Sequence, residues 1–308
     1  MLKAIMYHYV RGESDNFPYF KYLHVENFVK QLEYLGNEFG FISKKDFNEC
    51  LISGEPKKGV VLTFDDSLKD HRSHVLPNLI KRGLWGIFYV PTFYFNSKKI
   101  LDVHRIHLLL GAHGGTSVLK SLEELTTPDM LSHRYIKEFT SQTYINQNND
   151  SNAQYVKRTL NFYISYKYRE KIIDKLMESF DLNGEESADS FYMTAQELCE
   201  LRSAGMEIGS HTINHQVMSK LSSGKQKKEI EGSFSTLNSL LGNTFFKTFC
   251  YPYGGFHTFS PFTENFLQEI DCDFSFNVES RNITSCDLTS RKQALPRFDC
   301  NEFPNGAC

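Results

Sequence analysis

The stretch VVLTFDDSLKD, from Val60 to Asp70, decides the fold and raises the question of function. Its first five residues, Val60 to Phe64, are β-branched or apolar, which is the composition of a buried strand. Asp65 and Asp66 then stand side by side at the carboxyl end of that strand. Because neighbouring residues of an extended chain point to opposite faces, we expect the two carboxylates to meet different partners.

Short apolar runs alternate with helical patterns on both sides of this strand. Strands are predicted near residues 4–9, 59–64, 85–90, 206–209, 245–251 and 274–278. Helices are predicted near residues 25–35, 45–52, 74–82, 194–204, 225–241 and 261–270. This alternation predicts an α/β fold with a parallel sheet, whose functional groups gather at the carboxyl ends of the strands. Between the strands predicted at 85–90 and 206–209, the sequence pattern is mainly helical. We therefore predict one domain over residues 1–308 with a helical insertion at about 96–190.

Composition narrows the class of protein. The chain has 308 residues and a net charge of -3, which gives no reason to expect nucleic-acid binding. No window has the length and apolar content of a membrane span, and the first residues lack the apolar core of a signal peptide. Its 7 cysteines are odd in number and form no CxxC pair, which indicates free thiols in a reducing compartment. We therefore predict a cytoplasmic protein and make no prediction of its oligomeric state.

A second motif, EIGSHTINH, follows another predicted strand and ends at His215. His211 and His215 are four residues apart, so on a helical turn both imidazoles would lie on one side. An HxxxH pair alone is more typical of surface or helix-cap histidines than of a site. Together with one acid of TFDD, however, two neutral imidazoles suit a catalytic divalent metal, with Zn²⁺ the first choice. The other acid would then act as a base on the attacking water.

A third motif, FCYPYGGF, begins at Phe249 and also follows a predicted strand. Gly254 and Gly255 would let the backbone come close to a ligand, and the turn could direct a backbone N–H into the site. The alternative is a tight turn held by aromatic packing. The two preceding motifs favour the first interpretation, with Tyr253 and Gly254 as substrate contacts.

The three motifs, in this order on alternating strands and helices, resemble the polysaccharide deacetylases of the NodB-homology type. The resemblance covers roughly residues 1–95 and 190–300. It implies a distorted (β/α) barrel with fewer than eight complete strands and hydrolysis of the acetamide of an N-acetylated sugar. The opening MYHYV, with TFDDSLKDH, is similar to a YHxV-type branch that includes poly-N-acetylglucosamine deacetylases.

This resemblance also implies a role for each matching residue. Asp65 corresponds to the catalytic base and Asp66 to a metal ligand. His211 and His215 correspond to the other two ligands. Tyr253 corresponds to the residue whose backbone N–H helps to bind the oxyanion.

The sequence departs from the family pattern at two places. The arginine that begins the third motif in many members, where it orients the base, is absent from FCYPYGGF. The late LxH motif that supplies the acid is absent after residue 280, where ALPRFD stands at 294–299. Two substitutes are available. A histidine at the place of His8 in MYHYV resembles the acid of YHxV-type members, so His8 is predicted to be the acid, the alternative being a buried structural histidine. Arg297 is predicted to pair with Asp65 in place of the absent arginine, the alternative being a salt bridge elsewhere.

Other histidines are less informative. His104, in the DVHRIH stretch of the insertion, is predicted to line the substrate pocket. His71 and His74 follow TFDD closely, and we expect them on the surface of a helix, with a place near the site as the alternative for His71.

The leading functional prediction is a metal-dependent hydrolase that removes an N-acetyl group from an amino sugar. Because no secretion signal is found, we expect the substrate to be an intracellular precursor of a surface glycan, such as a sugar nucleotide, a lipid-linked sugar or an oligosaccharide. One alternative is another amidohydrolase on the same scaffold, a deformylase or an enzyme for a non-sugar amide. The other is a catalytically silent glycan-binding module.

Overall fold

The computed structural model describes residues 1–13, 20–144, 150–182, 188–242 and 244–307. The chain divides into two compact units. The first contains Met1–Ser14, Tyr22–Ser97 and Asp189–Cys308, and the second contains Asp15–Lys21 and Lys98–Ala188. The assignment of the second unit as an insertion at about 96–190 stays a prediction.

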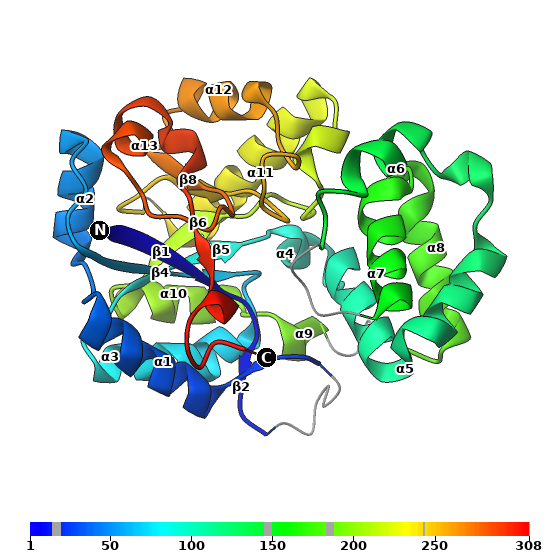
Figure 1. The fold of residues 1–308 in the computed structure, drawn as a ribbon, viewed down its shortest axis with the longest axis horizontal. Helices are drawn as coiled ribbons and strands as arrows, with labels where there is room; N and C mark the ends of the chain where they lie inside the picture. The colour runs from blue at the N-terminus through cyan, green and yellow to red at the C-terminus, as the bar shows by residue number, and fades with distance from the viewer. Residues whose placement is uncertain (14–19, 145–149, 183–187, 243, 308) are drawn as a thin grey trace. The chain divides into compact units, whose positions relative to one another are not determined.

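In the described part of the first unit, seven strands form one sheet in the order β8-β7-β6-β5-β4-β1-β9 (Figure 1). These strands are β1 (Leu2–Tyr7), β4 (Gly59–Asp65), β5 (Gly86–Val90), β6 (Glu207–Ser210), β7 (Thr248–Cys250), β8 (Phe274–Phe276) and β9 (Phe298–Asp299). Every neighbouring pair is parallel. A separate parallel pair joins β2 (Val10–Arg11) and β3 (Leu23–His24). The prediction of an α/β fold of the distorted (β/α) barrel type is confirmed.

The sheet curls until its two edges meet at residues 295–299. On one side, Leu295 bridges Phe276 at the end of β8, and Glu279 N donates to the Arg297 carbonyl at 3.0 Å. On the other side, Phe298 pairs with Ile5 of β1. Because this short segment is held from both sides, Arg297 is carried into the interior of the curled sheet.

Helices cover the outer face of the sheet (Figure 1). They are α1 (Val25–Glu38), α2 (Lys44–Ser53), a π-helical turn (His71–Val75), α3 (Leu76–Lys81), α4 (Phe93–Ser97), α9 (Ala188–Phe191), α10 (Ala195–Ser203), α11 (Ser223–Leu241), α12 (Pro261–Glu269) and α13 (Ser285–Ser290), with short 3₁₀ turns at Met218–Lys220, Lys292–Ala294 and Cys300–Glu302. The start of α10 follows from its sequence. Thr194 accepts from the Glu197 backbone N–H while the Glu197 carboxylate accepts from Thr194 N, which is a complete capping box.

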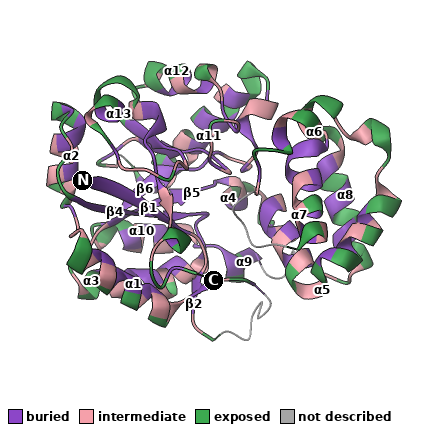
Figure 2. Cartoon of the chain, viewed as in Figure 1, coloured by how far each residue is buried: buried purple, intermediate pink, exposed green. Residues whose placement is uncertain are grey.

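Strand β4 is buried along its whole length, as Figure 2 shows for the sheet in general. Its side chains alternate between two apolar clusters. Val60, Leu62 and Phe64 pack in the cluster shared with the covering helices. Val61 packs in the other cluster, inside the curled sheet, with residues of β1, β5, β7 and β8. By the same alternation, Asp65 points into the interior of the sheet.

The second unit contains α5 (Asp102–Leu125), α6 (His133–Phe139), α7 (Ser151–Arg158), α8 (Tyr166–Ser179), a 3₁₀ turn (Pro128–Met130) and a π-helical turn (Thr159–Tyr163). α5 is kinked at Gly114, whose φ is 73°. In the interior of the second unit, the buried guanidinium of Arg169 donates to Asn161 Oδ1 at 2.7 Å. Among the described residues of the chain, no helix is both long enough and apolar enough to cross a membrane.

Candidate active site

The two adjacent acids separate where β4 ends. Asp65 is the last residue of the strand, whereas Asp66 and Ser67 have φ of 81° and 56°. Left-handed backbone at two consecutive non-glycine residues is unfavourable and is found where surrounding contacts enforce it. This sharp turn of the chain, added to the alternation of the strand, directs the two carboxylates to different partners.

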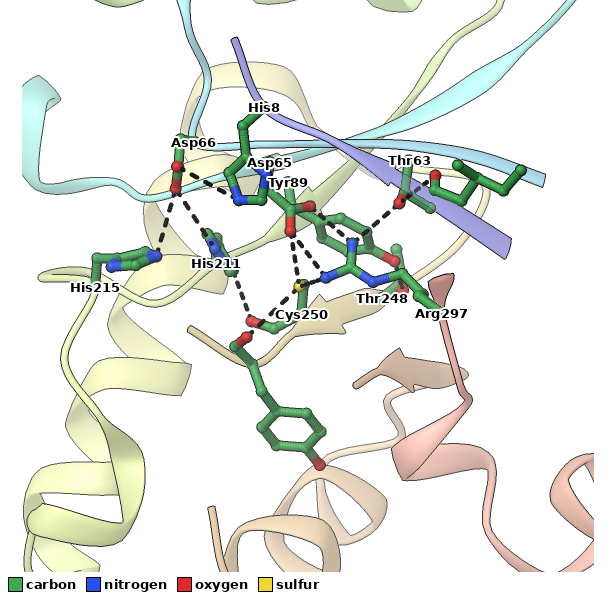
Figure 3. A network of polar contacts seen from close by, with 12 residues as sticks. His8, Thr63, Asp65, Asp66, Tyr89, His211, His215, Thr248, Cys250 and Arg297 are labelled. Carbon is green, nitrogen blue, oxygen red and sulfur yellow. Dashed lines mark hydrogen bonds and ion pairs between the residues drawn. The ribbon is translucent and has the colours of Figure 1, made fainter. Parts of the chain in front are cut away.

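Asp65 is held by a group that we call the clamp, made of Thr63, Asp65, Cys250 and Arg297 (Figure 3). The Arg297 guanidinium donates to Asp65 Oδ1 at 2.9 Å and to Oδ2 at 2.8 Å. It also donates to Thr63 Oγ1 at 3.0 Å and lies 2.9 Å from Cys250 Sγ. The side chains of Asp65 and Arg297 are only 2% and 1% exposed, so this bidentate pair is shielded from water.

The charges of the clamp support one another. Burial alone raises the pKa of Asp65, but the charge of Arg297 and the hydrogen bonds from Arg297 lower it, and the net pKa lies below the ordinary value. Burial likewise lowers the pKa of Arg297, and the nearby Asp65 raises it by more. Burial raises the pKa of the Cys250 thiol well above its ordinary value. At neutral pH the clamp therefore contains an ionised carboxylate, a guanidinium and a neutral thiol.

Asp66, His211 and His215 form a second group, which we call the ligand triad (Figure 3). Asp66 Oδ1 lies 3.6 Å from His211 Nε2 and 3.4 Å from His215 Nε2. Tetrahedral Zn²⁺ with nitrogen and oxygen ligands at about 2.1 Å places those ligands about 3.4 Å apart. His211 Nδ1 lies 2.8 Å from the Cys250 carbonyl, which fixes the tautomer that leaves Nε2 as a lone-pair donor. The residues present therefore fit a divalent cation.

A second group of potential ligands shares His211 with the triad. Asp65, His211 and Cys250 also bring their ligand atoms within 4.8 Å of one another. Two guanidinium nitrogens of Arg297 already contact Asp65, and one of them also contacts Cys250. A cation there would face this buried positive charge at short range, so the ligand triad is the better site.

The structure corrects the predicted geometry of the HxxxH pair. His211 to His215 do not form a helical turn, because Thr212 and His215 have φ of 66° and 50°. Thr212 Oγ1 instead accepts from His215 N at 2.9 Å. The two imidazoles meet, with ring centroids 4.7 Å apart, because a loop and not a helix brings them together.

His8 lies beside the triad. Its Nε2 is 3.9 Å from Asp66 Oδ2, longer than a hydrogen bond, and its side chain is 39% exposed. The structure thus places it at the edge of the site, between solvent and Asp66. The role of His8 stays a prediction, since proximity does not by itself make an acid.

His71 differs from its prediction. It is fully buried and lies in the π-helical turn, not on an exposed helix face. Its Nε2 lies 2.8 Å from the His8 carbonyl, and its ring packs edge-on against Phe64 and Phe88. Burial lowers its pKa to about 4. This contact could not be predicted from local pattern, because it depends on a π turn that brings residue 71 back to the end of β1.

The YPYG loop adjoins the triad as predicted from its place after a strand. The Tyr253 ring centroid lies 4.9 Å from that of His215, and the Tyr253 backbone is left-handed at φ 65°. Gly254 follows at φ 59°, and a Cβ there would lie 2.2 Å from Val278 Cγ2. Glycine is therefore required for packing as well as conformation, and its predicted contact with substrate stays a prediction.

His104 belongs to the second unit. It lies on α5 and is fully buried there, with its ring centroid 6.1 Å from that of His107. Its predicted place in the substrate pocket stays a prediction. The six described cysteines are all free, as their number and spacing suggested.

Comparison with known proteins identifies the family. The sequence profile described as "Polysaccharide deacetylase" matches residues 53–268, more than two thirds of the chain. The chain belongs to the polysaccharide deacetylase family. The prediction of a hydrolase of the sugar N-deacetylase class is confirmed at this level, whereas its metal dependence and the YHxV-type branch stay predictions. No curated protein matches the sequence.

Solved structures of deacetylases share the fold. The Streptococcus pyogenes deacetylase PplD in complex with acetate has a TM-score of 0.59 and 16% identity, over 97% of this chain and 91% of that one. IcaB from Ammonifex degensii has a TM-score of 0.54 and 17% identity, over 96% of this chain and 90% of that one. The BpsB deacetylase domain from Bordetella bronchiseptica has a TM-score of 0.53 and 12% identity, over 97% of this chain and 95% of that one. At these identities the likeness establishes the fold alone.

Proposed function

We propose that this chain removes the acetyl group from an N-acetylated amino sugar and that the clamp and the ligand triad perform the reaction. The observation that carries the proposal is the separation of two adjacent carboxylates into two environments. Asp65 is fixed by Arg297 in the buried clamp, and Asp66 meets two imidazoles. Family membership supports the reaction class.

The ligand triad would hold a divalent cation, with Zn²⁺ favoured by two imidazole nitrogens and one carboxylate. Lewis-acid polarisation of the acetamide carbonyl is the chemistry that such a cation supplies when bound. The remaining steps belong to side chains and backbone of this chain.

Asp65 would take a proton from the water that attacks the acetamide carbon. Arg297 keeps it ionised and fixes its orientation, at a cost in basicity, because the pKa of Asp65 is lowered. The Tyr253 backbone N–H would donate to the oxyanion of the tetrahedral intermediate. His8, half exposed beside Asp66, would give a proton to the amine as the C–N bond breaks. The products are acetate and the free amino sugar.

The substrate that we propose is an N-acetylated sugar carried on a small precursor of a surface glycan, such as a nucleotide-linked sugar. This choice follows the reducing compartment that the scattered cysteines predict. PplD is a deacetylase whose structure contains acetate, the product expected here, which supports the reaction and not the substrate.

The experiment is an acetate-release assay with the metal-loaded protein on nucleotide-linked N-acetylhexosamines and on chitin oligomers, with the Asp65→Asn variant as the blank. Release from the nucleotide sugars is expected. Release from the oligomers alone would overturn the proposed substrate and keep the reaction. Release of formate from formylated analogues, without acetate from any substrate, would overturn the reaction.

A further inference from the structure

The segment between the two histidines of the ligand triad has an unfavourable conformation. Thr212 is left-handed at φ 66°, and His215 at φ 50°. For residues other than glycine such backbone is unfavourable and persists only where neighbours enforce it. Something outside the segment must therefore hold it.

The carbonyl groups of this segment are bound by one neighbour. The Thr212 carbonyl accepts from Thr92 N at 3.1 Å, and the Ile213 carbonyl accepts from Phe93 N at 3.0 Å. The backbone N–H groups need separate partners, since a buried N–H without an acceptor is costly. For Ile213 and Asn214 these partners come from α11, whereas His215 N donates to Thr212 Oγ1 within the segment.

Glu229 on α11 binds the N–H groups of the segment. Its Oε2 accepts from Ile213 N at 3.0 Å and from Asn214 N at 2.8 Å. Its Oε1 accepts from Asn214 Nδ2 at 2.5 Å. Glu229 is only 6% exposed, so these charge-assisted bonds are shielded from water.

The same helix face fixes the start of the segment. Ser233, one turn beyond Glu229 on α11, shares a buried hydrogen bond with Ser210, the last residue of β6. His211 follows Ser210 directly. α11 thus contacts the chain before the first histidine and between the two.

We propose that Glu229 is a positioning residue for the metal site: it holds the segment between His211 and His215 so that both Nε2 atoms face Asp66. The inference rests on the proposed function, in which the ligand triad binds a divalent cation. Glu229 itself lies outside the triad and acts through Ile213 and Asn214. Supporting groups of this kind typically change metal affinity about 10- to 100-fold when they are removed.

The test compares three variants on the full chain. Glu229→Leu removes every acceptor, whereas Glu229→Gln keeps one for the two backbone N–H groups. Glu231→Leu is the matched control, because Glu231 is exposed on the same helix. Zn²⁺ affinity is measured by competition with a chromophoric chelator, and the absorption spectrum of bound Co²⁺ reports the ligand geometry. Both readouts are independent of turnover.

We expect Glu229→Leu to weaken Zn²⁺ binding by about tenfold or more and to alter the Co²⁺ spectrum. Glu229→Gln should recover part of the affinity, and Glu231→Leu should match the wild type. A folded Glu229→Leu protein with wild-type Zn²⁺ affinity and an unchanged Co²⁺ spectrum would overturn the inference. If Glu229→Leu does not fold, the test rests on Glu229→Gln. Wild-type Zn²⁺ affinity and an unchanged Co²⁺ spectrum in Glu229→Gln would overturn the inference, and weaker Zn²⁺ binding would support it. Absence of Zn²⁺ binding by the wild type would instead contradict the proposed function.

Discussion

The clamp and the ligand triad lie side by side, yet they are built differently. The clamp starts from the end of a regular strand, and its central guanidinium and carboxylate already form a bidentate pair. Two residues of the triad, Asp66 and His215, have left-handed backbone, and the triad brings together three potential ligand atoms. The comparison teaches that the clamp neutralises its own carboxylate with a guanidinium, whereas the triad gathers groups that would fit a divalent cation.

The largest effect should come from the base. Asp65→Asn keeps the size of the side chain and removes the proton acceptor, so we expect acetate release to fall by about a hundred- to ten-thousandfold. The measurement is turnover of the metal-loaded variant. An exposed carboxylate, changed as Asp271→Asn, provides the control and should turn over normally. Full activity of Asp65→Asn would remove the clamp from the reaction.

The second effect concerns stability of the clamp. Arg297→Met leaves Asp65 buried without its cation, and we expect the free energy of unfolding to fall by about 3–5 kcal/mol in a denaturant titration. Changing both residues, Asp65→Leu with Arg297→Met, removes the uncompensated charge and should recover most of that loss. If the free energy of unfolding falls equally in the single and double variants, the uncompensated charge of Asp65 is not the cause of the loss.

The third effect belongs to the triad. Zn²⁺ added to chelator-treated protein at a hundred times its dissociation constant should raise the free energy of unfolding by about 2.7 kcal/mol. His211→Ala should abolish this gain, and His133→Ala, which removes an exposed histidine, should keep it. A gain that survives in His211→Ala would place the cation elsewhere.

The smallest effect is the pH dependence of stability that the buried His71 causes. The folded pKa of His71 is lowered to about 4, so the unfolded chain binds the proton more readily between about pH 4 and 6.5. Stability should therefore fall as pH falls through this range. His71→Gln should reduce the slope by about 1.4 kcal/mol per pH unit, while His257, whose pKa is also lowered to about 4, keeps some dependence. An unchanged slope in the variant would contradict the buried neutral His71.

Some of this molecule could be predicted from local pattern and some could not. Strong periodicity predicted β4, α10 and α11 to within a few residues. The strand expected at 245–251 is only Thr248–Cys250, because β7 meets β6 through a single pair, Ser210 with Phe249. β9 was missed, since its two residues depend on edges of the sheet that meet only in the folded chain.

The site shows the same division. The motifs drew attention to Asp65, Asp66, His211 and His215 because each follows a strand at the carboxyl edge. Spacing alone suggested a helix for the histidines, and the loop that the structure shows depends on Glu229, 14 residues after His215 in the printed sequence. The residues around Arg297 in ALPRFD did not show whether its guanidinium would be buried or would form an ion pair on the surface.

The most direct test of the central claim is the Zn²⁺ content of Asp65→Asn and Asp66→Asn after equilibrium dialysis. The two substitutions remove the same charge from adjacent residues, so each serves as the control for the other. The account predicts that Asp65→Asn retains one Zn²⁺ per chain and that Asp66→Asn binds it much more weakly. Equal Zn²⁺ content in the two variants, or loss in Asp65→Asn alone, would contradict the division of labour between clamp and triad.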